Sequence, residues 1–91
     1  MEKVFYLDLK DITNKAELHE LLARELPLPD YYGKNLDALY DVLTDESDGW
    51  DLIFYNMPDA DEELNKYICK LKKLCARAVS ECYNLQIRFY P

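Results

Sequence analysis

The sequence predicts an α/β fold in which a small three-stranded parallel sheet is packed with three to four helices. Three short apolar stretches, residues 4–9, 52–55 and 85–90, are typical of strands. The chain between them repeats apolar residues at helical spacing. Strands that are separated by helices usually run parallel, with right-handed connections. The 91 residues fit one domain, which we expect to span residues 1–91.

The first helix is expected to begin at Asn14 and to end before Pro27. Asn14 can cap its N-terminus, and Glu17, three positions later, completes a variant of the capping box. Pro27 ends the helix because the residue before a proline is pushed out of the α region. The apolar positions of this helix keep helical spacing and are Leu18, Leu21, Leu22 and Leu26.

A stiff loop and a second helix follow. Residues 27–33 contain two prolines, which fix φ, and two adjacent tyrosines near the end of the loop. The second helix is expected over residues 35–44, with Asn35 as its N-cap. Asp37 then falls in the first turn, where the helix dipole favours a negative charge.

The second half of the chain predicts a turn, a central strand and a long helix. Residues 45–51 form a polar turn that contains Trp50, the single tryptophan. The continuous apolar run 52–55 indicates a strand that is buried on both faces, in the middle of the sheet. A long apolar stripe over residues 64–82 predicts the last helix, and a short separate helix near Pro58 is an open alternative.

The charge balance limits the classes of partner. Lysine and arginine total 11 against 18 aspartates and glutamates, which gives a formal net charge of -7. A nucleic-acid ligand or an anionic membrane surface would require clustered cations, so both are disfavoured. The acidity suits a cationic protein partner, because opposite fields speed association, although acidity also serves solubility alone.

The cysteines and the apolar pattern bear on the compartment. Cys69, Cys75 and Cys82 are odd in number and form no C-x-x-C pair, which disfavours a zinc site or a disulfide framework. We expect all three to be buried free thiols on one helical stripe, and hence a reducing compartment. Because the sequence shows no apolar run of membrane-spanning length and no signal-peptide pattern, we expect a cytoplasmic location.

The outward face of the second helix is the candidate binding surface. A helical wheel places Asp37 and Asp41 on one face, with Tyr40 at its edge. Like charges at this spacing cost an isolated helix about 0.2–0.5 kcal/mol, which weakly favours a binding role. Tyrosines are enriched at protein interfaces, and Tyr31 and Tyr32 precede this helix. The alternative is an ordinary solvated face with a tyrosine that half-covers the core.

No pattern in the chain predicts an enzyme. The lone histidine, His19, has no nucleophile at a motif spacing and is expected at the surface. Asp37 and Asp41 could form a hydrolytic carboxylate pair, but no partner motif accompanies them. The acids of residues 59–63 lack the register of a calcium loop and fit a helix N-terminus better. We therefore expect a protein that is not an enzyme and that needs no cofactor or metal.

A specific resemblance covers the loop and the second helix. Residues 26–44 read LPLPDYYGKNLDALYDVLT, which resembles the signature of the barstar family. The resemblance implies a barstar-like α/β fold. It further implies an immunity protein that inhibits a basic, barnase-type ribonuclease inside the cell and works as a monomer. A non-inhibitory acidic module that binds another basic protein remains the alternative.

The resemblance also assigns roles to residues. Asp41 matches the dominant acidic anchor of the family, Asp37 a neighbouring acid, and Tyr31 a loop tyrosine that stacks on the enzyme. Tyr40 stands where the family usually has tryptophan. Core packing is the alternative role for Tyr32. The full set expected at the partner is Tyr31, Tyr32, Gly33, Asn35, Asp37, Tyr40, Asp41, Thr44 and Glu81.

Two positions depart from the pattern of the family. Arg77 aligns with an expected acid of the last helix and reverses its charge, whereas Glu81, one turn later, retains an acid. Asp45 and Glu46 replace a Gly-Trp pair after the second helix. Both departures bear on which ribonuclease the resemblance implies as the partner.

Overall fold

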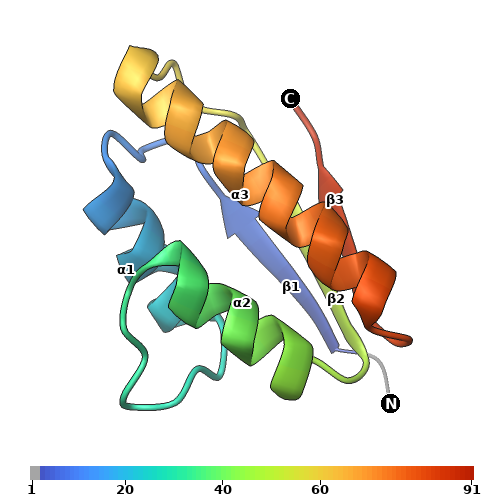
Figure 1. Ribbon diagram of the computed structural model, residues 1–91. Helices are drawn as coiled ribbons and strands as arrows, with labels where there is room; N and C mark the ends of the chain where they lie inside the picture. Colours follow the sequence, from blue (N-terminus) through green and yellow to red (C-terminus); the bar gives the residue numbers. More distant parts are fainter. Residues whose placement is uncertain (1–2) are drawn as a thin grey trace.

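The structure is a computed structural model that describes residues 3–91. The elements run in the order β1 (Lys3–Asp8), α1 (Lys15–Glu25), α2 (Leu36–Asp45), β2 (Trp50–Tyr55), α3 (Glu62–Glu81) and β3 (Gln86–Phe89) (Figure 1). The three strands form one sheet in the order β1-β2-β3, and both pairs are parallel. The predicted α/β class, the parallel sheet and the central place of the strand at residues 52–55 are all confirmed.

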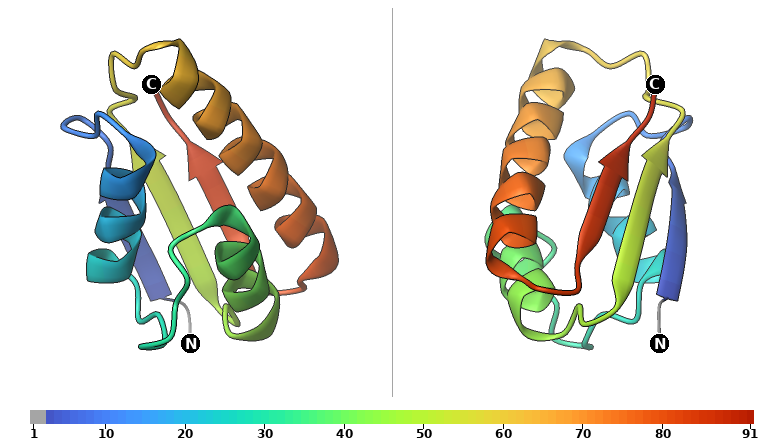
Figure 2. Two further views of the ribbon diagram at one scale, coloured as in Figure 1. Left: turned by 60° about the vertical axis from the view of Figure 1, so that its left-hand side comes forward. Right: turned by 90° about the vertical axis from the view of Figure 1, so that its right-hand side faces the viewer.

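All three helices cover the same face of the sheet, as both views in Figure 2 show. The other face is open, and Tyr6 and Val4 of β1 are 62% and 45% exposed there. Along β2, buried side chains alternate with half-buried ones. The expectation that residues 52–55 are buried on both faces is therefore wrong, because within residues 3–91 the helices cover only one face of the sheet.

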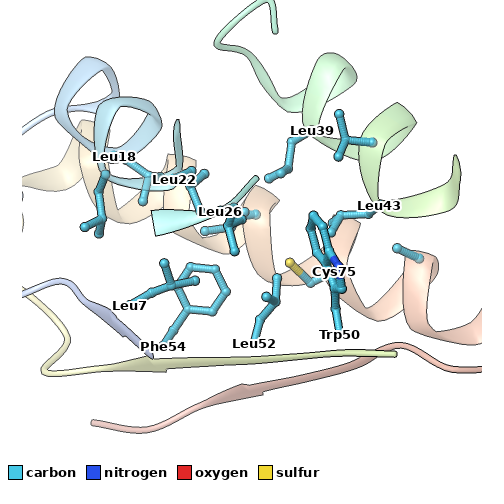
Figure 3. Packing of buried hydrophobic residues seen from close by; sticks show 14 of the residues in the cluster. Leu7, Leu18, Leu22, Leu26, Leu39, Leu43, Trp50, Leu52, Phe54 and Cys75 are labelled. Atoms are coloured by element: carbon cyan, nitrogen blue, oxygen red, sulfur yellow. The ribbon is translucent and has the colours of Figure 1, made fainter. Parts of the chain in front are cut away.

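The hydrophobic core lies between the sheet and the helices (Figure 3). Side chains from every layer reach it, and the figure labels Leu7, Leu18, Leu22, Leu26, Leu39, Leu43, Trp50, Leu52, Phe54 and Cys75. Complete burial of one such leucine or phenylalanine stabilises the fold by about 1.5–3 kcal/mol. Trp50 does not belong to the polar turn: it is the first residue of β2, is buried, and packs edge-on against Phe5 at 5.4 Å between ring centres.

Local signals set the ends of α1. The Asn14 side chain caps the helix by accepting a hydrogen bond from the Glu17 backbone N–H at 2.9 Å. The Glu17 carboxylate accepts from the Thr13 backbone N–H at 2.8 Å and from the Thr13 hydroxyl, so it reaches back to the residue before the N-cap. At the other end Leu26 is extended, as the proline after it requires.

The cysteines are only partly as predicted. Cys75 is buried, and its burial raises the pKa of the thiol to about 12. Cys82 is half-buried, whereas Cys69 is exposed because it lies off the apolar stripe of α3. The separate helix near Pro58 is not formed, since residues 57–61 have no helical or strand structure. None of the helices in the described part of the chain is long and apolar enough to cross a membrane.

Candidate protein-binding face

Helix α2 presents acids to solvent because its other side is anchored in the core. Leu39 and Leu43 are 1% and 0% exposed and fix the rotation of the helix about its axis. Asp37 and Asp41 then lie on the exposed side, as the helical wheel predicts. Both carboxylates remain hydrated before a partner binds, so the free chain does not carry the cost of a buried charge.

The start of α2 is tied to the loop before it. Asn35 caps the helix with its Oδ1, which accepts from the Ala38 backbone N–H at 2.8 Å, while its Nδ2 donates to the Gly33 carbonyl at 3.2 Å. A Cβ on Gly33 would lie 3.2 Å from that same Nδ2. Lys34, between them, has a φ of 55°, a region that side chains with a Cβ seldom adopt. The shape of this corner therefore depends on Gly33 and Asn35 together.

The two adjacent tyrosines of the loop face different environments. Tyr31 is 84% exposed, whereas Tyr32 is only 9% exposed and belongs to the core cluster. The Tyr32 backbone N–H donates to the Pro29 carbonyl at 3.0 Å and closes a turn. Tyr31 is thus available to a partner. The ring of Tyr32 takes the core-packing role that the sequence left open.

The expectation of a surface position for His19 is wrong. His19 is 1% exposed, and its Nδ1 and Nε2 lie 2.6 Å and 2.5 Å from the hydroxyls of Tyr32 and Tyr67. A neutral imidazole donates once and accepts once, so one hydroxyl donates to His19 and the other accepts from it. Burial lowers the pKa of His19 and raises the pKa of Tyr32. Through these hydrogen bonds His19, Tyr32 and the half-buried Tyr67 join α1, the loop and α3.

A hollow of about 250 Å³ lies between the loop and α2. Its lining consists of Pro29, Tyr31, Tyr32, Ala38, Asp41, Val42, Asp45 and Glu46. Three acidic residues and an exposed tyrosine thus line one small space, which suits a cationic side chain. Sequence reasoning placed Tyr31 and Asp41 in the binding set but treated Asp45 and Glu46 only as departures. The i, i+4 spacing of Asp41 and Asp45 is a signal that could have added Asp45.

We call the exposed side of α2, which carries Asp37 and Asp41, the acidic face. At its border away from the hollow, this face meets α3 through three polar side chains. The Tyr40 hydroxyl donates to Oε1 of Glu81, and the Arg77 Nε donates to the same oxygen at 3.2 Å. The Arg77 guanidinium carbon lies 5.2 Å from the centre of the Tyr40 ring. The hydrogen bond from Tyr40, with the Arg77 cation beside it, lowers the pKa of Glu81. The Glu81 carboxylate is therefore bonded within the chain. We refer to Tyr40, Arg77 and Glu81 as the Arg77 cluster.

The family that is described as "Barstar (barnase inhibitor)" matches residues 2–90, almost the whole chain. The chain belongs to the barstar family. This family is defined by inhibition of an enzyme, which agrees with the expectation that the chain is not itself an enzyme. The described α/β fold, with three parallel strands and three helices, is consistent with that membership.

A curated relative points the same way. The chain is 48% identical over 50 residues to the "Putative ribonuclease inhibitor YrdF" of Bacillus subtilis (strain 168). The match covers 55% of this chain and 50% of that protein, so it spans about half the length of the relative. The barstar family and this relative together support a role related to ribonuclease inhibition.

Some of the residues that the barstar-type signature assigns to the partner are exposed, whereas others are already hydrogen-bonded within the chain. Tyr31, Gly33, Asn35, Asp37 and Asp41 are exposed, but the Asn35 amide is already hydrogen-bonded within the chain. The Thr44 hydroxyl donates to the carbonyls of Tyr40 at 2.9 Å and Asp41 at 3.2 Å, within its own helix. The exposed acids and Tyr31 are therefore the groups that remain available for contact.

Proposed function

We propose that this chain inhibits a basic ribonuclease by filling the active-site cleft of the enzyme with α2 and the loop of residues 27–33. The observation that carries the proposal is the hollow between the loop and α2, whose lining includes Asp41, Asp45 and Glu46 together with the exposed Tyr31. Such a site complements a surface that is cationic because it binds RNA phosphates. The membership of the barstar family supports the same reading.

The proposed mechanism needs no catalysis by this chain. The carboxylates of α2 take the places that substrate phosphates occupy, because both are anions that accept hydrogen bonds from arginine and lysine. The Tyr31 ring takes the place of a base. Stacking needs only a flat aromatic face, so a surface of the enzyme that stacks on a base can also stack on this ring. One cationic side chain of the enzyme enters the hollow, where Asp41 and its neighbours pair with it. RNA is then excluded from the cleft by occupancy.

The loop is held in shape before any partner arrives. The Tyr32 hydroxyl is bonded to His19 at 2.6 Å, and Asn35 bonds Gly33 at 3.2 Å. Two prolines restrict the backbone further. A surface that is already ordered loses less conformational entropy on binding, so more of the contact energy remains as affinity. This rigidity supports a role as a tight protein ligand.

Asp41→Ala tests the proposal, with barnase as the enzyme and RNA cleavage as the readout. We expect the substitution to weaken inhibition by about 2–5 kcal/mol, at least about thirtyfold, because it leaves cations of the enzyme desolvated and unpaired. Asp59→Ala is the matched control: it removes another exposed carboxylate, in the loop before α3, and should leave inhibition unchanged.

Two results would contradict the proposal in different ways. If Asp41→Ala inhibits as well as the wild-type chain, the carboxylates of α2 do not fill the cleft. If the wild-type chain inhibits no basic ribonuclease, the acidic face serves a different basic protein. Capture from the native cell, followed by mass spectrometry, would then identify that protein.

A further inference from the structure

The acidic face has a cationic border on the α3 side. Arg77 packs against Tyr40, the neighbour of Asp41 in α2. The Arg77 side chain is 74% exposed, against 47% for Glu81, its ion-pair partner. The guanidinium is thus the outer member of the pair. A protein that docks on α2 and reaches this border meets a cation first, although the rest of the face is acidic.

Arg77 is also held in place, unlike Lys73 of the same helix. Its ion pair with Glu81 and its stacking on the Tyr40 ring restrain the guanidinium from two directions. Lys73, about one turn earlier, forms no ion pair among residues 3–91. A restrained guanidinium loses less side-chain entropy in an interface than a flexible lysine does. A fixed charge can therefore discriminate between partners by position.

We infer that Arg77 determines which ribonucleases the chain accepts. It favours an enzyme that carries a carboxylate at the edge of its basic cleft, opposite Arg77, and it disfavours one that carries a cation there. This inference rests on the proposed function, because it requires α2 to face the cleft. Acids alone would accept any basic cleft. The cation at the border supplies the repulsive element through which interfaces reject wrong partners.

The test is a reciprocal charge swap with barnase as the probe. In a set of barnase variants, each lysine or arginine around the cleft is replaced by glutamate, one at a time. The affinity of each variant is measured for the wild-type chain and for Arg77→Glu. We expect at least one barnase variant to bind the wild-type chain about tenfold more tightly than unmodified barnase does. The same variant should bind Arg77→Glu about tenfold more weakly than unmodified barnase does.

Two further variants keep the test decisive. Arg77→Gln removes the cation without placing a second carboxylate beside Glu81, so it preserves the test if Arg77→Glu does not fold. It should lose the preference for that barnase variant. Lys73→Glu changes the net charge by the same amount on the same helix. It should keep the wild-type preference, because Lys73 lies outside the Arg77 cluster.

The outcomes separate this inference from the proposed function. If Asp41→Ala abolishes binding but no barnase variant distinguishes the wild-type chain from Arg77→Gln and Arg77→Glu, Arg77 does not set specificity, and the proposed function stands. If Lys73→Glu shows the same swap as Arg77→Glu, the effect is one of net charge, and the inference also fails. If binding is insensitive to Asp41→Ala, both the inference and the proposed function fail.

Discussion

His19 shows how a single residue can escape sequence reasoning. Its partners Tyr32 and Tyr67 are 13 and 48 positions away in the chain, so no local sequence pattern predicts these contacts. The N-caps Asn14 and Asn35, in contrast, bond backbone groups three residues ahead and were predicted from short patterns. At the residue scale, what can be predicted is what is local.

The burial of His19 has a consequence for stability against pH. The folded chain holds the pKa of His19 below its ordinary value of 6.5, so as the pH falls the unfolded chain takes up the proton first. The free energy of unfolding should therefore fall below about pH 6.5, by up to about 1.4 kcal/mol per pH unit. Urea unfolding at about pH 7.5 and about pH 5.5 measures the change.

His19→Gln is the matched variant for this prediction. A glutamine amide can donate to one hydroxyl and accept from the other, as the neutral imidazole does, but it does not titrate in this range. The free energy of unfolding of His19→Gln should change less between the two pH values than that of the wild-type chain. Equal pH dependence in both proteins would show that other groups, not His19, cause the loss.

At the scale of the element, α2 was the best predicted part of the site. The sequence placed it at residues 35–44, and the structure has Leu36–Asp45 with Asn35 as the N-cap. Its acidic and buried sides were predicted because helical periodicity and exposure are linked. The contact of Tyr40 with Arg77 was not predicted, since it depends on how α2 and α3 pack against each other.

The cap of α2 gives an element-level prediction. Asn35→Ala removes both the cap and the bond to Gly33. It should lower the free energy of unfolding by about 0.5–2 kcal/mol and also weaken inhibition, because the loop that carries Tyr31 loosens. Asn14→Ala removes the equivalent cap of α1 and should cost similar stability without loss of inhibition. Chemical unfolding and inhibition assays on both variants provide the comparison.

If both variants lose inhibition equally, the loss reflects stability alone and not the shape of the loop. A loss of inhibition confined to Asn35→Ala supports the coupling of cap and loop. The pair is informative because each asparagine accepts from a backbone N–H three residues later, at 2.9 Å for Asn14 and 2.8 Å for Asn35.

At the scale of the whole molecule, the sequence pattern predicted the order of the elements and the parallel sheet. Apolar runs that are separated by helical stretches leave few other topologies. The placement of all helices on one face was not predicted, although it is what two right-handed connections require when they cross in the same direction from β1 to β2 and from β2 to β3. A run such as residues 52–55 is equally apolar whether helices cover one face or two, so composition cannot distinguish the cases.

The net charge of -7 predicts a salt-sensitive encounter with a basic ribonuclease. Association with barnase should slow by on the order of tenfold between about 0.01 M and about 0.15 M salt, because ions screen the attraction between the two proteins. Asp45→Asn should reduce this dependence, since it removes a carboxylate of the hollow. Glu25→Gln, at the end of α1, should not. Stopped-flow rates that do not respond to salt would exclude electrostatic steering.

Trp50 gives this chain an optical property that follows directly from its place in the core. The single indole is 4% exposed and lies against Phe5, at the sheet face that the helices cover. Its fluorescence therefore reports the state of the interior, where loss of packing admits water and shifts the emission to the red. Folding can thus be followed without a label. The acids and Tyr31 on the binding face carry no indole to obscure that signal.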